Sequence, residues 1–160
     1  MEASVTHRLI LGLSLTILAC GGGGRESSPG TVATTSSPQE SVRGFFQAVA
    51  DSDVTGMTHL WGTARGPSAV TGQPHDYQKR MVVAQLFLRG APFKILGEEA
   101  VDGAADRRLV QVQLNRGQCV KNLPVLTVRM ASGQWLVTQI DLNLAGHPGR
   151  PCTSESRSEN

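Results

Sequence analysis

The sequence predicts an α+β domain in which helices pack on one face of an antiparallel sheet. Between residues 37 and 90 the apolar residues recur at helical spacing, whereas after Pro92 they alternate with polar residues, as in half-buried strands. The helical segments come first and the strands last, without the strand–helix alternation that produces a parallel sheet. We therefore expect about three helices followed by about four strands, over residues 37–144.

The first helix has a strong start signal. Ser37, Pro38 and Glu40 form an S-x-x-E capping box with proline at the first helical position. Four apolar residues then follow at positions i, i+3, i+4 and i+7, namely Val42, Phe45, Phe46 and Val49. This spacing places them on one face of a helix, which we expect to be the buried face.

Two further helices are expected before residue 90. Asp51 or Asp53 can cap a short helix, which carries Met57, Leu60 and Trp61. We expect a loop over residues 62–74 and then a longer helix from about Asp76 to Arg89, ended by Gly90. The apolar stripe of this longer helix consists of Tyr77, Met81, Ala84 and Leu88.

Four strands are expected in the second half of the domain, at residues 93–101, 109–114, 125–130 and 135–144. Asp102-Gly103 and Ser132-Gly133 are turn signals between them. By alternation along the last two strands, the face toward the core is expected to carry Leu126, Val128, Met130, Leu136, Ile140 and Leu142. The opposite, outer face is expected to carry Gln111, Gln113, Thr127, Arg129, Trp135, Val137, Gln139 and Asp141.

Residues 1–19 have the pattern of an export signal. Basic residues precede an apolar run over residues 9–19, which is shorter than the roughly 20 residues needed to span a bilayer. The run ends in LTILAC, and this stretch resembles the lipobox of bacterial lipoproteins. The resemblance implies that Cys20 carries a diacylglycerol and becomes the acylated first residue, which anchors the protein durably to a membrane. A buried helix with a chance cysteine is the alternative, but four glycines follow Cys20.

The lipoprotein resemblance also implies a location. Gly21 follows the cysteine, at a position where aspartate is associated with retention in the inner membrane. The resemblance therefore implies a periplasm-facing protein of the cell envelope, in the outer rather than the inner membrane where two membranes are present. Residues 20–36 are rich in Gly, Ser and Thr and predict a flexible linker, whereas residues 145–160 predict a polar tail.

Two cysteines remain if Cys20 is lipidated. In an oxidising compartment Cys119 and Cys152 allow one pairing, which would tie the polar tail to the turn before the third strand. Two free thiols, or a partner elsewhere, are the alternatives. The chain contains no C-x-x-C motif, so nothing in the sequence indicates redox catalysis.

The order of helices and strands resembles the nuclear-transport-factor-2-like fold, also called the cone-shaped cystatin-like fold. The matching features, over Pro38–Leu144, are the opening helix SPQESVRGFFQAV, the short helix Asp53–Trp61 and the closing hairpin SGQWLV. The resemblance implies a curved sheet that forms a cone with the helices. The family contains isomerases, dehydratases, hydrolases, dimerisation modules and exported domains, so the fold does not by itself imply an activity.

The resemblance also implies positions for candidate site residues. Enzymes of this fold place an Asp, Tyr or His inside the cone, and His59, Trp61 and Tyr77 could line its mouth. The alternative is that Tyr77 packs with its hydroxyl at the rim while His59 is exposed. Asp141 lies on the last strand, where a catalytic base could sit, but its parity favours a surface pair with Arg129 over a buried base.

Composition excludes several function classes. The 15 Lys and Arg residues nearly balance 13 Asp and Glu residues, so there is no basic face of the kind that binds nucleic acid. No Cys/His spacing typical of zinc and no phosphate-binding glycine loop occurs. Neither a metal nor another cofactor is therefore expected.

Three functions remain from the sequence. The first is a non-enzymatic, lipid-anchored envelope domain that binds a small apolar ligand or a protein partner. The partner would use the outer face of the sheet, with Arg129, Trp135 and Asp141, because a mixed polar face with an exposed Trp suits an interface. The second is an isomerase- or dehydratase-type enzyme with its site inside the cone. The third is an accessory subunit that forms a homodimer through the sheet.

Overall fold

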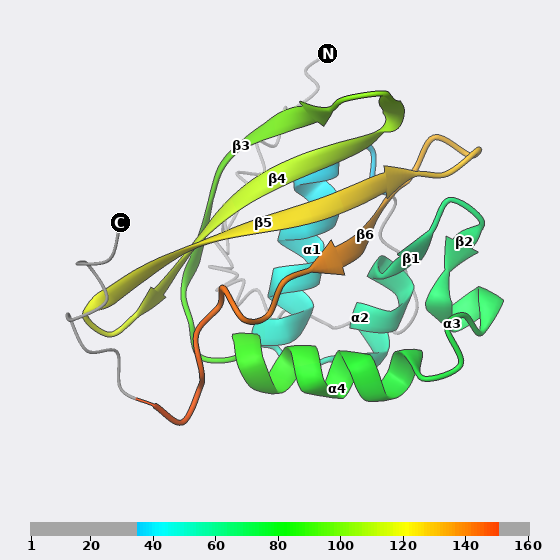
Figure 1. The fold of residues 1–160 in the computed structure, drawn as a ribbon. Helices are drawn as coiled ribbons and strands as arrows, with labels where there is room; N and C mark the ends of the chain where they lie inside the picture. Colours follow the sequence, from blue (N-terminus) through cyan, green and yellow to red (C-terminus); the bar gives the residue numbers. More distant parts are fainter. Residues whose placement is uncertain (1–34, 151–160) are drawn as a thin grey trace, which may run out of the picture. The chain divides into compact units, whose positions relative to one another are not determined.

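The computed structural model describes residues 35–150, which belong to the second of the two compact units of the chain, residues 32–160 (Figure 1). The predicted signal peptide at residues 1–19, most of the linker at 20–36, the lipidation site Cys20 and the cysteine Cys152 lie outside the described residues. The predicted lipid anchor and disulfide therefore stay predictions. Within the described part, the α+β class is confirmed.

Helix α1 (Pro38–Ala50) begins with the predicted capping box. The backbone N–H of Glu40 donates to the Ser37 hydroxyl over 3.2 Å, and the Glu40 carboxylate accepts from the backbone N–H of Ser37 over 3.2 Å. Pro38 occupies the first helical turn, where its missing N–H costs no hydrogen bond. The predicted apolar stripe is buried, with Val42, Phe45, Phe46 and Val49 each no more than 2% exposed.

Helix α2 (Val54–Leu60) is capped by Asp53, whose carboxylate accepts from the backbone N–H of Gly56 over 2.8 Å. The loop expected at residues 62–74 is only partly a loop. It contains a small hairpin of β1 (Gly62–Thr63) and β2 (Gly66–Pro67), followed by the short helix α3 (Ser68–Thr71). These elements are too short to show a periodic pattern in the sequence, so the described residues have four helices instead of three.

Helix α4 (Tyr77–Leu88) lies close to its predicted position. Met81, Ala84 and Leu88 of the predicted stripe are buried, whereas Tyr77 is half-buried. Arg89 is the C-cap residue, and Gly90 follows with a φ of 69°, a conformation that favours glycine. The C-terminal end of α4 is tied to the sheet, because the Arg116 guanidinium donates to the backbone carbonyl of Phe87.

The predicted antiparallel sheet of four strands is confirmed, in the order β3-β4-β5-β6. The strands are β3 (Phe93–Val101), β4 (Ala104–Arg116), β5 (Cys119–Arg129) and β6 (Trp135–Ile140). Strands β4 and β5 are longer than the alternation indicated, and β6 is shorter. Strand β6 ends early because Asp141 begins a turn, in which its carboxylate accepts from the backbone N–H of Asn143 over 3.0 Å.

The predicted inner and outer faces of β5 and β6 are only partly correct: Ile140 packs against the core as expected, but Thr127 and Val137 do not lie on an outer face. Thr127 and Val137 are fully buried and pair across the two strands, and Val137 belongs to the core under the helices. Val128 and Leu136 pair on the opposite face of the sheet. The parity of β5 is ambiguous in the sequence because Val125 and Leu126 are both apolar, and a register shift after Leu126 also changes the parity of β6.

Helix α1 crosses one face of the sheet and contacts all four of its strands, and α4 packs against α1 and α2 (Figure 1). The Phe45 ring lies 6.0 Å from the Phe46 ring and 6.1 Å from the Trp61 ring, and Phe46 lies 5.1 Å from Phe93. These aromatic contacts join α1, the end of α2 and β3 in one core.

Both ends of the described chain pack on this domain. Thr35, in the predicted linker, is buried, and the backbone N–H of Trp135 donates to its carbonyl over 3.0 Å. Ala145, at the start of the predicted tail, is fully buried in the core. The packed part of the chain therefore includes residues on both sides of the 37–144 segment.

Candidate functional site

A groove of about 310 Å³ lies between α4 and the end of β6. Its apolar lining comes from three elements: Trp61 after α2, residues of α4, and the segment around the end of β6. The apolar residues are Trp61, Met81, Val83, Ala84, Ile140 and Leu142. Its charged lining comes from Asp76, Lys79 and Arg80. A concave apolar surface with a few polar groups is the usual form of a small-molecule site, and this one is at the small end of the range.

The apolar wall of the groove is part of the folded core. Met81 and Ala84 are 1% and 4% exposed, so α4 presents them from its packed side, whereas Val83 is 40% exposed at the opening. Ile140 and Leu142 are half-buried and pack against the core cluster. The wall is therefore set by the packing of α4 and β6 and does not depend on a ligand.

Trp61 is held in place by its backbone. Its carbonyl accepts from the N–H of Ser68 over 2.8 Å, and it forms a parallel bridge with Val137 of β6. Its ring packs on Phe45 at an angle of 41°. Trp61 thus links the end of α2 to the edge of the sheet, and its half-buried ring faces the groove as a fixed surface.

The charged end of the groove contains an ion pair. The Arg80 Nε lies 2.9 Å from the Asp76 Oδ1, one helical turn away, and the two side chains are 57% and 53% exposed. The hydrogen bond from Arg80 holds the pKa of Asp76 below its ordinary value, and the same bond raises the pKa of Arg80. Both groups are therefore ionised at neutral pH.

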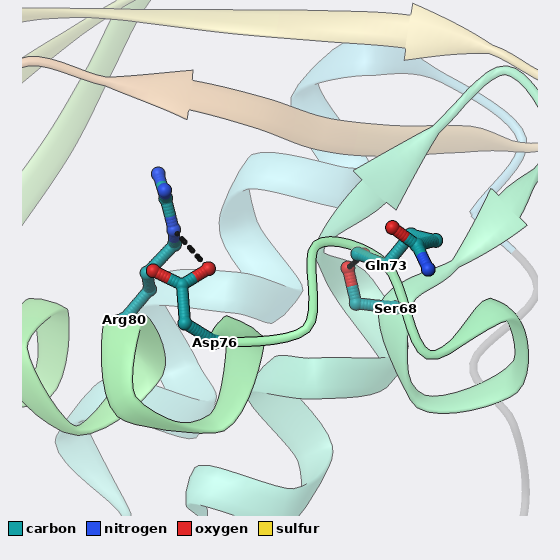
Figure 2. A network of polar contacts seen from close by, with 4 residues as sticks. All are labelled: Ser68, Gln73, Asp76 and Arg80. Carbon is teal, nitrogen blue, oxygen red and sulfur yellow. Dashed lines mark hydrogen bonds and ion pairs between the residues drawn. The ribbon is translucent and has the colours of Figure 1, made fainter.

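The turn before α4 positions this ion pair. The buried Ser68 hydroxyl donates to the Gln73 carbonyl over 2.7 Å, which fixes the segment between α3 and α4. Figure 2 shows this turn leading directly to Asp76, and the Arg80 side chain extending from α4 toward the strands above it. Arg80 thus extends from α4 on the side of the helix that lines the groove.

The structure separates the three residues expected at the cone mouth. His59 and Tyr77 line a second pocket of about 270 Å³, together with Val54 and Val82 from the two helices. Trp61 lines the groove instead. His59 and Tyr77 are half-buried, so neither is fully exposed nor part of the core. They share a pocket with each other but not with Trp61.

The partner surface expected on the sheet has Trp135 as its central residue, and the structure does not expose that residue. Trp135 is only 8% exposed, and its backbone carbonyl accepts from the Thr35 hydroxyl. The Arg108 guanidinium lies 5.9 Å from the centre of its ring, on the same face as Thr127. The expectation of an exposed Trp is therefore wrong: Trp135 is buried on the same face as Thr127, and the chain before α1 is hydrogen-bonded to its backbone.

The expected surface pair of Arg129 and Asp141 does not form in the described part of the chain. Arg129 pairs with Trp135, the first residue of β6, whereas Asp141 follows the last residue of that strand. The two side chains therefore belong to opposite ends of β6. Both are exposed, and the Asp141 carboxylate caps the turn at Asn143.

Most of the groove could not be predicted from the sequence. Lys79 and Arg80 are adjacent basic residues, and such pairs are usually solvated. The i,i+4 spacing of Asp76 and Arg80 could have indicated the ion pair. Nothing in the sequence could have brought Ile140 and Leu142 to α4, because that contact depends on where β6 ends and how the helix packs.

Two other features are absent from residues 35–150. No group of three or more His, Cys, Asp or Glu side chains there could hold a metal ion. No helix in that range is long and apolar enough to cross a membrane. Cys119 is half-buried at the start of β5. The predicted disulfide would therefore join the tail to this end of the strand.

Comparison with known proteins adds no relative. The chain matches no protein-family model, no curated protein and no solved structure.

Proposed function

We propose that this protein is a lipid-anchored domain of the bacterial cell envelope that binds a small apolar ligand in the groove between α4 and β6, without transforming it. Cys20 is the proposed lipidation site, and the domain faces the periplasm. We also propose that the domain belongs to the nuclear-transport-factor-2-like class. The order of helices followed by a four-stranded antiparallel sheet supports this assignment, as does the passage of α1 across that sheet.

The apolar lining of the groove carries the binding proposal. Six apolar side chains from three elements converge there, and two of them, Met81 and Ala84, are otherwise buried in the core. Transfer of an apolar ligand from water to such a surface is favourable by about 25 cal/mol for each Å² that is buried. The Trp61 ring packs on the buried Phe45 ring and adds an aromatic surface to the site.

An enzyme of the isomerase or dehydratase type is less well supported than a binding protein. Such an enzyme needs a general acid or base whose pKa lies near the working pH. Asp76 is the carboxylate in the groove, and Arg80 shifts its pKa downward, away from neutrality. A carboxylate that is held ionised and exposed to water is a weak base.

The buried position of Trp135 also weakens the alternative of a partner that docks on the sheet. An interface core needs an accessible aromatic anchor, and Trp135 is only 8% exposed. The groove is the better-supported site because its own aromatic residue, Trp61, is half-buried and lines a cavity.

A pair of matched variants tests the groove. Val83 lines it and Val82 does not, although the two are adjacent on α4 and are 40% and 54% exposed. We expect Val83→Phe to fill the opening and weaken binding of Nile red, a neutral dye that fluoresces in apolar surroundings, by about tenfold. Val82→Phe adds the same side chain outside the groove and should leave Nile red binding unchanged. Equal binding by both variants and by the unmodified protein contradicts the proposal.

A further inference from the structure

We infer that the ligand of the groove is an anionic amphiphile, an aliphatic chain that ends in a carboxylate, and that Lys79 and Arg80 bind its head group. This inference rests on the proposed function and specifies its ligand class. Three observations carry it: the separation of charged from apolar lining, the balance of charge at the charged end, and the direction of Arg80.

The lining of the groove is divided into two parts. Its charged residues, Asp76, Lys79 and Arg80, lie at the N-cap and in the first turn of α4. Its apolar residues come from later in that helix, from Trp61 and from the end of β6. A ligand that is apolar throughout would leave the charged end unused, whereas a small anion would leave the apolar part in contact with water. An amphiphile satisfies both parts at once.

The charged end has an excess of positive charge. It holds two cations and one carboxylate, and Asp76 is bonded to a single nitrogen of Arg80, the Nε. Within residues 35–150, neither the two Nη atoms of Arg80 nor the ammonium of Lys79 has a hydrogen-bond or ion-pair partner. Lys79 also contributes through its charge to the lowered pKa of Asp76, as expected for a cation that lines the same groove.

The bond to Asp76 leaves Arg80 able to bind an anion. A guanidinium has five N–H donors in a planar fork, and binding through Nε leaves the donors of both Nη atoms for a second anion. Figure 2 shows that the Arg80 side chain extends from α4 toward β6, with the Asp76 carboxylate beside its Nε. Because Arg80 and Lys79 both line the groove, a carboxylate bound there can accept from the Nη donors and from the Lys79 ammonium.

Three ligands with the same ten-carbon chain test this inference on the purified protein. Decanoate is anionic, decanol is neutral and decylammonium is cationic, and each is titrated below the concentration at which it forms micelles. Binding is followed by calorimetry and by the fluorescence of Trp61, which lines the groove, whereas Trp135 is 8% exposed and lies outside it. We expect decanoate to bind about tenfold more tightly than decanol, with decylammonium the weakest.

Single charge variants then locate the head group. Lys79→Gln and Arg80→Gln should each lower the preference for decanoate over decanol by about threefold to tenfold, while the affinity for decanol stays the same. Lys94→Gln removes an exposed lysine of β3, outside the groove, and is the matched control. The preference should also decrease as salt is added, because these charges are exposed.

The outcomes separate this inference from the proposed function. Equal affinity for decanoate and decanol, or tighter binding of decylammonium, overturns the anionic ligand class while the apolar groove stands. Loss of the decanoate preference in Lys94→Gln as well as in Lys79→Gln would show a general charge effect and also overturns it. If none of the three ligands binds and Val83→Phe leaves Nile red binding unchanged, both the inference and the proposed function are wrong.

Discussion

At the scale of single residues, the start of α1 shows how three side chains define an element. The Glu40 carboxylate accepts from the Ser36 hydroxyl over 2.5 Å, from the Ser36 N–H over 2.9 Å and from the Ser37 N–H over 3.2 Å. The bond from the Ser36 hydroxyl is the largest reason that the pKa of Glu40 lies below its ordinary value of 4.5. The capping box therefore depends on the ionised carboxylate.

This dependence predicts a loss of stability in acid. The folded state lowers the pKa of Glu40, so its contribution is present above the unfolded value of 4.5 and is lost as the pH falls through the lower, folded value. We expect Glu40→Gln to lower the urea midpoint at neutral pH and to have a smaller effect at about pH 3. Urea unfolding of both proteins at each pH measures this difference.

Glu98→Gln is the matched control, since Glu98 is exposed on β3. It should leave the urea midpoint nearly unchanged at either pH. An equal effect of Glu40→Gln at neutral and acidic pH would mean that the charge of Glu40 is not what holds the cap.

At the scale of elements, the apolar pattern of the sequence predicts the long helices better than the short elements between them. The longer helices α1 and α4 were placed closely, because each has several apolar residues at helical spacing and a stop or start signal. Helix α3 and the β1–β2 hairpin were missed because each is shorter than one period of any pattern. The buried Gly62 is fixed by contact instead, since a Cβ there would lie 2.3 Å from the Gly66 carbonyl oxygen.

The sheet shows a second limit. The alternation in β4 was assigned correctly, and Val110, Val112 and Leu114 are fully buried. In β5 the apolar residues occur at both parities, so only pairing with β4 decides that Val125 faces the helices, opposite Val110. A register shift between neighbouring strands leaves no signal in a single sequence, because it depends on both strands at once.

The packing of α1 on the sheet predicts the cost of core mutations. Phe45 is fully buried and contacts the rings of Phe46 and Trp61, whereas Leu96 of β3 is 49% exposed. We expect Phe45→Ala to lower the free energy of unfolding by about 3–5 kcal/mol, the usual cost of emptying a buried aromatic site. Leu96→Ala should change it by less than about 0.5 kcal/mol. Equal effects in denaturant unfolding would contradict the position of α1 in the core.

At the scale of the whole molecule, the proposed role combines a membrane anchor with a binding groove. The groove requires the described domain, where Trp61, α4 and the end of β6 meet. The anchor requires only Cys20 and the export signal before it, which follow from local sequence. The two parts of the proposal therefore make independent predictions.

The anchor predicts a specific effect of one cysteine. We expect Cys20→Ser to abolish incorporation of radiolabelled palmitate and to remove the mature protein from the membrane fraction, because the thiol that carries the diacylglycerol is lost. Cys119→Ser removes a cysteine of the folded domain and should leave labelling intact. Palmitate labelling of Cys20→Ser at the level of the unmodified protein would rule out lipidation at this residue.

The fold class, the start of α1 and the four strands follow from the sequence, because each depends on residues that are near one another in the chain. The tertiary structure decided which face of β5 and β6 is buried, where Trp135 lies, and which residues form the groove. These depend on contacts between distant segments: Thr35 with Trp135, Trp61 with Val137, and α4 with Ile140 and Leu142. The pattern of one segment does not specify such contacts. Where apolar residues occupy both sets of alternating positions in a strand, either face could be the buried one, and only the element that packs on the strand decides which face it is.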